Sequence, residues 1–333
     1  MCAQVSIIIP NRNKAAYLRE TLDSVIAQSY QDWEAIIVDD ASTDNSKNII
    51  RSYTDKDDRI QLIVNDSSSG GSACRNIGIK NSKGRFIIFF DSDDLLEEFC
   101  IEERMLFQGQ FPSHDFWVFT MKEFLDDVSD GCRLWKLKQD GNHLGRFLSM
   151  DVAPWQTMQP LWDRRFVERI NGYDIEYPRF QDIEFHVRAL LQAGVSYRVS
   201  TSKIPDCYYR ILRRRGQAGA EFAASLVSGA NMYISKTHCL LKKDKRFIGL
   251  ESRKLRAVSV ASLGHVFHVL RVGDITRREA VEFVNEMKAH SAFEVFDTRF
   301  SRWIFLLYCR MGFSRSFNVK GIKRLIQRTI PLV

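Results

Sequence analysis

The sequence predicts an α/β fold with a Rossmann-like, mostly parallel sheet flanked by helices. Three observations lead to this prediction. Short apolar runs alternate with segments of helical periodicity over the first 95 residues, polar clusters follow these runs, and one run ends in three carboxylates within four residues. Alternating strands and helices are typical of parallel sheets with crossover helices, which bind ligands at the carboxyl ends of their strands.

The first strand and helix are predicted within the first 26 residues. Residues 5–10 form an apolar run that ends at Pro10, which lacks the N–H that a continuing central strand needs. Apolar residues and one threonine then recur at helical spacing, at positions 17, 18, 21, 22, 25 and 26. A strand followed by an amphipathic helix is therefore expected.

The same alternation continues to residue 90. A second strand is expected at 33–38, a helix capped by Asp44-Asn45-Ser46 after it, and a third strand at 60–64. Gly70-Gly71 then precedes a helix, and residues 86–90 form the fourth strand. Asp39, Asp40, Asp91 and Asp93 would consequently lie along one edge of the sheet.

The acidic cluster Asp91-Ser92-Asp93-Asp94 has two interpretations. Asp-x-Asp at a strand end suits Mg²⁺ or Mn²⁺, which take a few protein oxygens and complete their coordination with water and substrate phosphate. Alternatively, the cluster is an Asp-rich turn that ends a strand and caps the next helix, because Asp and Ser are also common turn residues. Taken alone, the cluster does not choose between them.

The order and spacing of four segments resemble family-2 glycosyltransferases of the GT-A fold. The segments are Val5-Ser6-Ile7-Ile8-Ile9-Pro10 with Asn13, Val38-Asp39-Asp40-Ala41-Ser42-Thr43-Asp44, Ala73-Cys74-Arg75-Asn76-Ile77-Gly78, and Phe90-Asp91-Ser92-Asp93-Asp94. The resemblance covers roughly the first 210 residues, the size of one large α/β domain. It implies a nucleotide-sugar donor and inversion at the anomeric carbon.

The resemblance also implies roles for single residues. Asp39 would contact the base, Arg75 would lie near the nucleotide, and Asp91 and Asp93 would bind the divalent metal, Mn²⁺ or Mg²⁺. The predicted nucleotide-sugar site comprises Pro10, Asn13, Asp39, Asp40, Arg75, Asp91 and Ser92. As alternatives, Arg75 is a solvated helix residue and residues 40–44 are a polar loop.

The second half of the domain is expected to supply a catalytic base. Residues 162–174 resemble the family segment in which a Gly-aromatic-Asp turn leads to the catalytic helix, and Gln181-Asp182 follows. The family usually has Glu-Asp there, with the Asp as base. Asp182 is therefore the predicted base, Gln181 removes a like charge beside it, and Glu184 is the reserve candidate.

Further acceptor contacts are predicted in the same half. His186, one helical turn after Asp182, would orient a substrate or complete the metal shell; alternatively, it is a hydrogen-bonded packing histidine. Trp155 and Trp162 would offer ring faces to a sugar, or belong to the buried core. With Gln181, these residues complete the candidate acceptor site.

Composition limits the class and location of the protein. The 333 residues are 45% hydrophobic and 27% charged, as in a soluble globular chain. Seven cysteines without Cys-x-x-Cys predict neither a disulfide framework nor zinc, and suit a reducing cytoplasm. The early strand leaves no room for a signal peptide, and no apolar run reaches the roughly 20 residues that span a bilayer.

Two domains are predicted. Residues 1–215 form the glycosyltransferase domain, with a nucleotide-sugar half at 1–95 and an acceptor half at 96–215. Residues 216–333 form a helical region, with helices at 221–241 and 254–270 and a third opened by a capping box at 276–279.

The end of the chain is strongly basic. Residues 299–333 contain eight Lys or Arg and no acid, so the net charge of +7 leaves −1 for the remainder. Apolar residues at 319, 322, 325, 326 and 330 form a stripe opposite the basic ones. This pattern suits an anionic membrane surface, or alternatively a terminal helix packed on the domain. Nucleic acid is disfavoured, because no nucleic-acid motif accompanies the charge.

The sequence thus predicts a metal-dependent inverting glycosyltransferase that moves one sugar from a nucleotide-sugar, UDP being favoured, to a glycan or lipid-linked acceptor in surface polysaccharide biosynthesis. It would be cytoplasmic and peripheral at the inner membrane face. A single addition is favoured because the Gln-x-x-Arg-Trp of similar processive synthases is missing: Arg299 stands before Arg302-Trp303. The alternatives are a non-catalytic nucleotide-sugar or glycan-binding protein and a nucleotidyltransferase, whose usual Gly-rich loop after the first strand is absent.

Overall fold

The computed structural model describes residues 3–130, 133–135, 137, 141–149 and 153–211, and isolated positions between 225 and 241. The chain divides into two compact units. The first comprises residues 1–141, 154–175 and 188–213, and the second comprises 142–153, 176–187 and 214–333. The boundary expected after residue 215 separates two contiguous pieces, whereas these units interleave along the chain.

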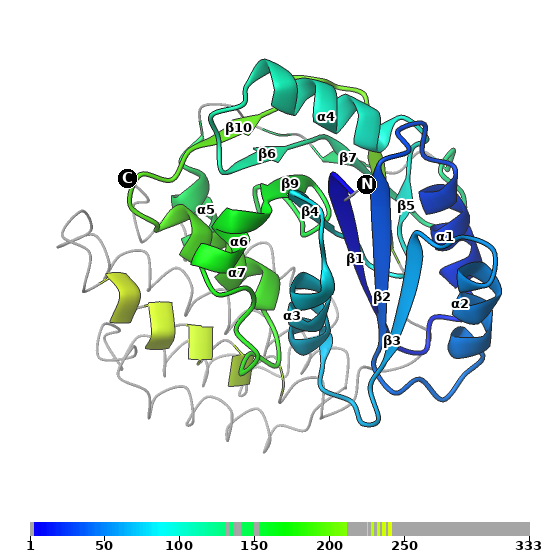
Figure 1. Cartoon of the computed structure of the whole chain (residues 1–333). Coiled ribbons are helices and arrows are strands. Elements are labelled where there is room, and N and C mark those ends of the chain that lie inside the picture. The colour runs from blue at the N-terminus through cyan, green and yellow to red at the C-terminus, as the bar shows by residue number, and fades with distance from the viewer. Residues whose placement is uncertain are drawn as a thin grey trace, which may run out of the picture. The chain divides into compact units, whose positions relative to one another are not determined.

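The first unit is built on a seven-stranded sheet (Figure 1). Its strands, in spatial order, are β10 (Tyr197–Val199), β6 (Phe116–Val118), β9 (Pro160–Asp163), β4 (Phe86–Phe89), β1 (Val5–Asn11), β2 (Trp33–Asp39) and β3 (Ile60–Val64). All neighbouring pairs are parallel except those of β9, which is antiparallel to both β4 and β6. The four predicted strands are confirmed, as is their parallel pairing.

Three helices connect the first four strands. α1 (Leu18–Ile26) and α2 (Ser46–Thr54) lie on one face of the sheet, and α3 (Gly71–Asn81) lies on the other (Figure 1). This follows from right-handed crossovers: the chain moves outward from β1 to β3 and then reverses across β1 to reach β4, so the reversing helix covers the opposite face. The reversal leaves a switch point between β1 and β4, where such sheets bind ligands.

The central strands carry the core of this unit. The hydrophobic side chains of β1, β2 and β4 are almost completely excluded from solvent, because helices cover both faces of the sheet. Burial on both faces explains why apolar residues occupy consecutive positions in these strands, at residues 7–9, 35–38 and 86–89, instead of alternating with polar ones.

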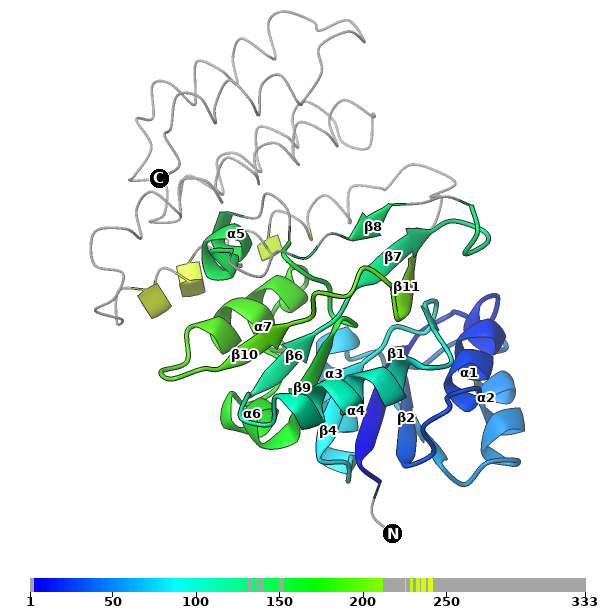
Figure 2. The ribbon, with the colours of Figure 1, turned by 90° about the horizontal axis from the view of Figure 1, so that it is seen from above.

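A second, four-stranded sheet was not anticipated from the sequence. Its strands, in spatial order, are β5 (Leu95–Leu96), β11 (Cys207–Arg210), β7 (Met121–Phe124) and β8 (Leu134–Trp135). Figure 2 shows β8, β7 and β11 side by side. Helix α4 (Cys100–Gln110), which follows β5 in the sequence, is joined to this sheet by Arg104. The fully buried Arg104 guanidinium donates to both carboxylate oxygens of Asp206, next to β11, at 2.7 and 3.0 Å.

Three further helices, α5, α6 and α7, lie after the first sheet strands in the described part of the chain. α6 (Arg164–Arg169) follows β9 and is capped by the Asp163 side chain, which accepts from the Arg165 N–H at 2.9 Å. α5 (His143–Ser149) lies in the second unit, and α7 (Gln181–Leu190) begins there. Within the ranges that the structure describes, no helix is long and apolar enough to cross a bilayer.

Several expected features lie largely or wholly outside the described residues. The described positions between 225 and 241 that have a conformation assigned are helical, in agreement with the helix expected at 221–241. The helices expected at 254–270 and from 276, and the basic segment 299–333, fall outside the described residues.

Candidate functional site

The loops that follow β1 and β2 are joined by side-chain hydrogen bonds. Asn13, in the left-handed region at φ 53°, accepts through Oδ1 from the N–H groups of Thr43 (2.8 Å) and Asp44 (3.3 Å). Its own N–H donates to the Ser42 hydroxyl at 3.0 Å. Asparagine tolerates this backbone conformation better than most residues. Asn13 thus fixes the two loops at the carboxyl edge of the sheet.

Asp39 ends β2 beneath these loops and is completely buried. One carboxylate oxygen accepts from the Asn11 side-chain amide at 2.8 Å, and the other accepts from the Ser42 N–H at 3.0 Å. Pro10 lies next to Asn11 in β1, opposite Val38. In this structure Asp39 holds the two loops together, and its contact with a base remains a prediction.

Asp40 fastens the loop that precedes α3. Its carboxylate accepts from the N–H groups of Ser69 (2.7 Å) and Gly70 (3.0 Å), from the hydroxyls of Ser68 and Ser69, and from the Asn65 amide. Burial alone would raise the pKa of Asp40, but these hydrogen bonds outweigh it and hold the pKa well below its usual range. An ionised Asp40 therefore keeps the Ser/Gly loop and the start of α3 in place.

Arg75, on α3, meets the acidic turn after β4. Its guanidinium lies 2.5 Å from the Asp91 carboxylate and 5.2 Å from the centre of the Tyr173 ring. The Arg75 side chain is 8% exposed, whereas that of Asp91 is 38% exposed. The structure therefore brings together two predicted site residues, with Asp91 facing solvent beside a fixed cation.

The partner of Asp93 was not foreseen. The ammonium of Lys14, in the loop after β1, lies 2.5 Å from an Asp93 carboxylate oxygen. Burial raises the pKa of Asp93, the bond to Lys14 lowers it, and the nearby charge of Asp91 raises it again, with a net increase. Lys14 and Arg75 thus place one positive charge beside each of the two predicted metal ligands.

Arg210, at the end of β11, is a second unforeseen residue of the site. Its Nε donates to the Asp93 carbonyl at 2.8 Å, its backbone N–H donates to the Asp94 carboxylate at 2.8 Å, and its Nη2 donates to Glu20 at 2.6 Å. Asp94 is buried, and burial followed by the charges of Asp91 and Asp93 raises its pKa. Arg210 therefore fixes the turn that carries the carboxylates, in which Ser92 is buried.

A turn after α6 supports the Arg75 side of the site. Asn76, next to Arg75 on α3, donates to the Tyr173 carbonyl and accepts from the Tyr173 N–H, both at 2.8 Å. The preceding Gly172 has φ 59°, and a Cβ there would lie 2.5 Å from the Asn76 Oδ1. Glycine is thus required by both backbone conformation and space, and Asn76 sets the position of the ring beneath Arg75.

The predicted base belongs to the second unit. Gln181 and Asp182 begin α7 and are both half-buried. The reserve candidate, Glu184, is buried, and its N–H donates to the Phe180 carbonyl at 2.8 Å. The predicted helix is confirmed, and the catalytic role of Asp182 remains a prediction.

The aromatic and histidine candidates are buried. Trp155 and Trp162 lie in the core, with ring centroids 6.1 and 4.4 Å from that of Phe116, as the core alternative expects. His186 stacks on Phe147 at 5.0 Å, and burial lowers its pKa to about 3 against an opposing hydrogen bond with the Asp182 backbone. A neutral, stacked ring fits the packing alternative for His186.

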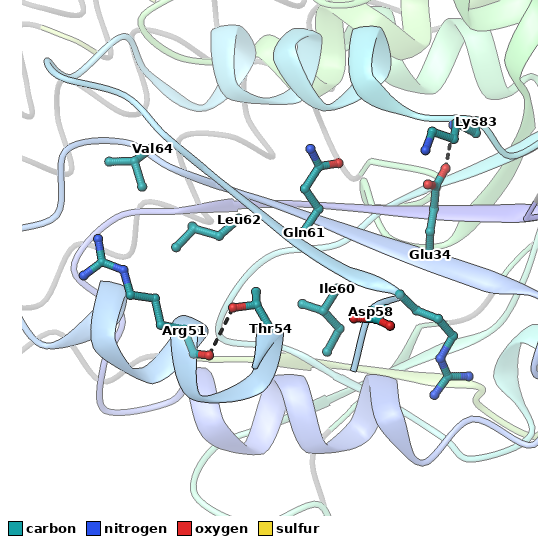
Figure 3. Close-up of a pocket in the computed structure, with 10 residues that line it drawn as sticks. Glu34, Arg51, Thr54, Asp58, Ile60, Gln61, Leu62, Val64 and Lys83 are labelled. Atoms are coloured by element: carbon teal, nitrogen blue, oxygen red, sulfur yellow. Dashed lines mark hydrogen bonds between the residues drawn. The ribbon is translucent and has the colours of Figure 1, made fainter. Parts of the chain in front are cut away.

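A surface pocket of about 630 Å³ lies elsewhere, along β3 and α2 (Figure 3). Arg51 and Thr54 of α2, with residues of β3, line it. Glu34 at one end is engaged by the Lys83 N–H at 2.5 Å. None of the predicted site residues lines this pocket, so it is distinct from the cluster at the carboxyl edge of the sheet.

The carboxylates at the β4 end fit a divalent ion that is also held by its substrate. Within the described part of the chain, no group of three or more His, Cys, Asp or Glu side chains is arranged to hold a metal. The Asp91 and Asp93 carboxylates would offer oxygen ligands to such an ion, and Mg²⁺ commonly binds through one or two carboxylates together with substrate phosphates and water. The donor set therefore suits a metal that arrives with a diphosphate.

Comparisons with known proteins relate part of the chain to glycosyltransferases. The sequence model of glycosyl transferase family 2 matches residues 6–143. The chain is 38% identical over 103 residues to Bacillus subtilis TuaG, whose name links it provisionally to teichuronic acid biosynthesis, covering 31% of this chain and 41% of TuaG. It is also 38% identical over 91 residues to WfgD of Escherichia coli, named a UDP-Glc:alpha-D-GlcNAc-diphosphoundecaprenol beta-1,3-glucosyltransferase, covering 27% of this chain and 35% of WfgD. The chain thus spans less than half the length of these relatives.

The fold matches a solved structure over nearly its whole length. Residues 1–349 of S. aureus TarS, crystallised with UDP-GlcNAc, superpose with a TM-score of 0.63 at 16% identity, covering 98% of this chain and 92% of that one. At this identity the likeness concerns the fold alone. The mostly parallel sheet flanked by helices is accordingly the predicted GT-A type.

Proposed function

Because residues 6–143 match the sequence model of glycosyl transferase family 2, we propose that the protein is an inverting glycosyltransferase that transfers one sugar from a nucleotide-sugar to a glycan or lipid-linked acceptor. The proposal rests on the pairing of two carboxylates with two cationic side chains at the carboxyl end of β4. Asp91 pairs with Arg75 and Asp93 pairs with Lys14, both at 2.5 Å, at the switch point of the sheet. Carboxylates for a metal and cations for phosphates are what a nucleoside diphosphate requires.

A uridine nucleotide is the favoured donor. The name of WfgD specifies UDP-Glc, and the solved TarS structure contains UDP-GlcNAc. Neither fixes the sugar for this chain. We therefore propose a UDP-sugar, whose sugar is identified by the UDP-sugar that releases UDP in the presence of an acceptor.

Surface polysaccharide assembly is the favoured context. The names of TuaG and WfgD refer to teichuronic acid and to a diphosphoundecaprenol acceptor. A lipid-linked acceptor would bring the enzyme to a membrane surface, for which the basic segment 299–333 is suited by composition.

The mechanism follows from the charges of the proposed site. Asp182 accepts the proton of the acceptor hydroxyl, whose oxygen attacks the anomeric carbon from the face opposite the diphosphate. Arg75 and Lys14 bind and orient the diphosphate, and Arg210 keeps the carboxylate turn in position. A Mg²⁺ or Mn²⁺ ion held by Asp91 and Asp93 would neutralise the charge that develops on the leaving diphosphate.

The test is a thermal-shift panel of UDP, GDP, CMP and dTDP, each with Mn²⁺ and with EDTA. A ligand at 100 times its Kd stabilises the folded protein by about 2.7 kcal/mol. We expect UDP to raise the melting temperature in the presence of Mn²⁺ but not in EDTA. When an acceptor is supplied, we expect one UDP-sugar to release UDP. No shift with any nucleotide would refute the donor site, and binding without transfer to any acceptor would favour a binding protein.

A further inference from the structure

We propose that Lys14 is an exchangeable cation: it holds Asp93 while the site is empty, and it moves to the donor diphosphate when the metal takes Asp93. The inference rests on the proposed function, because it requires Asp93 to be a metal ligand. It adds a residue outside the metal-binding signature and makes metal binding depend on the nucleotide.

The two cations of the site differ in mobility. Arg75 is 8% exposed, lies on α3 and is packed against the Tyr173 ring. Lys14 is 29% exposed and lies in the loop after β1, where its ammonium pairs with Asp93. Lysine carries its charge on a flexible four-carbon stem. Lys14 can therefore leave its carboxylate by side-chain rotation, whereas Arg75 stays beside Asp91.

The backbone around Lys14 is fixed, which limits the movement to the side chain. The Lys14 N–H donates to the Ser46 hydroxyl at 3.2 Å, and the flanking Asn13 and Ala15 are bonded to the loop after β2. The ammonium lies 6.0 Å from the centre of the Tyr17 ring. A tethered backbone keeps the released ammonium close to the carboxylate turn.

The charges explain why the movement accompanies donor binding. In the free protein Lys14 and Arg75 balance the charges of Asp91 and Asp93. A divalent ion on the two carboxylates makes the Lys14 ammonium surplus at the point where an anionic diphosphate arrives, and an ammonium binds phosphate as a point charge. When metal binds without nucleotide, it must displace the Lys14 ammonium from Asp93 with no phosphate for the ammonium to bind. Metal and nucleotide should therefore each increase the affinity of the protein for the other.

The experiment measures binding rather than turnover. Titration calorimetry of the full chain gives the Kd of Mn²⁺ alone and the Kd of UDP with saturating Mn²⁺. For Lys14→Met we expect Mn²⁺ alone to bind about fivefold more tightly, as for loss of one partly exposed ion pair, and UDP to bind at least fivefold more weakly. The reciprocal enhancement between Mn²⁺ and UDP should fall correspondingly.

Three variants make the result decisive. Lys56→Met removes an exposed lysine after α2 and should change neither Kd. Lys14→Arg keeps the charge, so it should preserve the weak binding of Mn²⁺ alone, and it replaces Lys14→Met if the latter fails to fold. Asp93→Asn should abolish Mn²⁺ binding.

The outcomes separate the two proposals. If the wild-type protein binds neither UDP nor Mn²⁺ with UDP, the proposed function fails. If the wild type binds both but Lys14→Met has unchanged constants, or binds both ligands less tightly, Lys14 does not compete with the metal and the exchange is refuted. If Lys14→Met fails to fold, Lys14→Arg is measured instead. A Kd of Mn²⁺ alone that differs from the wild-type value by fivefold or more in Lys14→Arg would also refute the exchange.

Discussion

Asp182 is the residue on which the proposed chemistry depends. Replacement of Asp182 by Asn keeps the size of the side chain and removes its ability to accept a proton. We expect sugar transfer to fall by about 10²–10⁴-fold, the usual contribution of a positioned general base. Initial rates with the best donor and acceptor provide the measurement.

Nucleotide binding serves as the control for this variant. Asp182→Asn should leave the Kd of the Mn²⁺–UDP complex unchanged, because Asp182 is not among the proposed contacts to the nucleotide or the metal. Near-normal transfer with intact nucleotide binding would show that Asp182 is not the base, and Glu184→Gln would then be the variant to measure.

The lowered pKa of His186 predicts that the free energy of unfolding depends on pH. Burial lowers its pKa to about 3 in the folded protein, while the unfolded chain has the ordinary value of about 6.5. Between these values the unfolded state binds a proton that the folded state does not, so stability falls as the pH falls through this window. The loss should approach about 1.4 kcal/mol per pH unit.

His186→Phe isolates this contribution, because a phenyl ring retains the stacking on Phe147 and cannot be protonated. Urea denaturation at pH 7.5 and at pH 5 measures the difference. The wild type should lose more stability than the variant across this range. Equal losses would mean that His186 is accessible to protons in the folded protein.

The site could be predicted from sequence only in part, for a physical reason. Asp91 and Asp93 directly follow an apolar run, so a local pattern reveals them. Lys14 and Arg210 reach the same turn from positions 79 and 117 residues away, and single lysines and arginines in a chain with 48 of them carry no local signal. Their roles depend on which strands become neighbours.

At the scale of elements, the contact between α3 and β1 is unusually close. A methyl group on Gly78 would overlap the Ile8 Cγ2, and it would lie 3.2 Å from Cγ1. Alanine favours a helix interior by about 1 kcal/mol over glycine, but overpacking costs about 1–3 kcal/mol. We therefore expect Gly78→Ala to destabilise the protein by up to about 2 kcal/mol in urea denaturation.

A double-mutant cycle checks the cause. Ile8→Ala removes the overlapping methyl group, so in that background Gly78→Ala should be neutral or stabilising, by up to about 1 kcal/mol. The same loss in both backgrounds would mean that Ile8 is not the obstacle.

The elements of the first 90 residues were predictable because each is local. β1 to β4 are predominantly apolar runs, and α1 to α3 lie between them with helical spacing or glycine punctuation. β9 was not predicted, because its four residues are too few to show a periodicity. In the sheet it lies between β4 and β6, and its antiparallel direction depends on contacts with both of these strands. The second sheet pairs β11 with β7, a long-range pairing that a local pattern does not contain.

At the scale of the whole molecule, one buried ion pair connects segments 102 residues apart. Arg104 of α4 binds Asp206 through two hydrogen bonds and the Met158 carbonyl through a third, at 3.0 Å. Arg104→Met would leave the Asp206 carboxylate buried without its cation. We expect a loss of about 3–5 kcal/mol in denaturant unfolding, the usual cost of breaking one partner of such a pair.

Removing both charges together should restore much of this stability. Arg104→Met combined with Asp206→Leu leaves no uncompensated charge, and well-packed apolar replacements of buried pairs are often neutral. If the double variant is as unstable as the single one, the hydrogen bond to Met158 rather than the ion pair accounts for the loss.

The strand order also determines how the protein can be divided. The segment that matches the family ends at residue 143, yet β9 lies between β4 and β6, and Arg210 of β11 holds the turn that bears Asp93. A fragment ending at 143 would expose the edges of two central strands, a recognised cause of aggregation. Any shortened form prepared for crystallisation, or any chimera that exchanges the donor half between enzymes, must therefore retain the chain through Arg210.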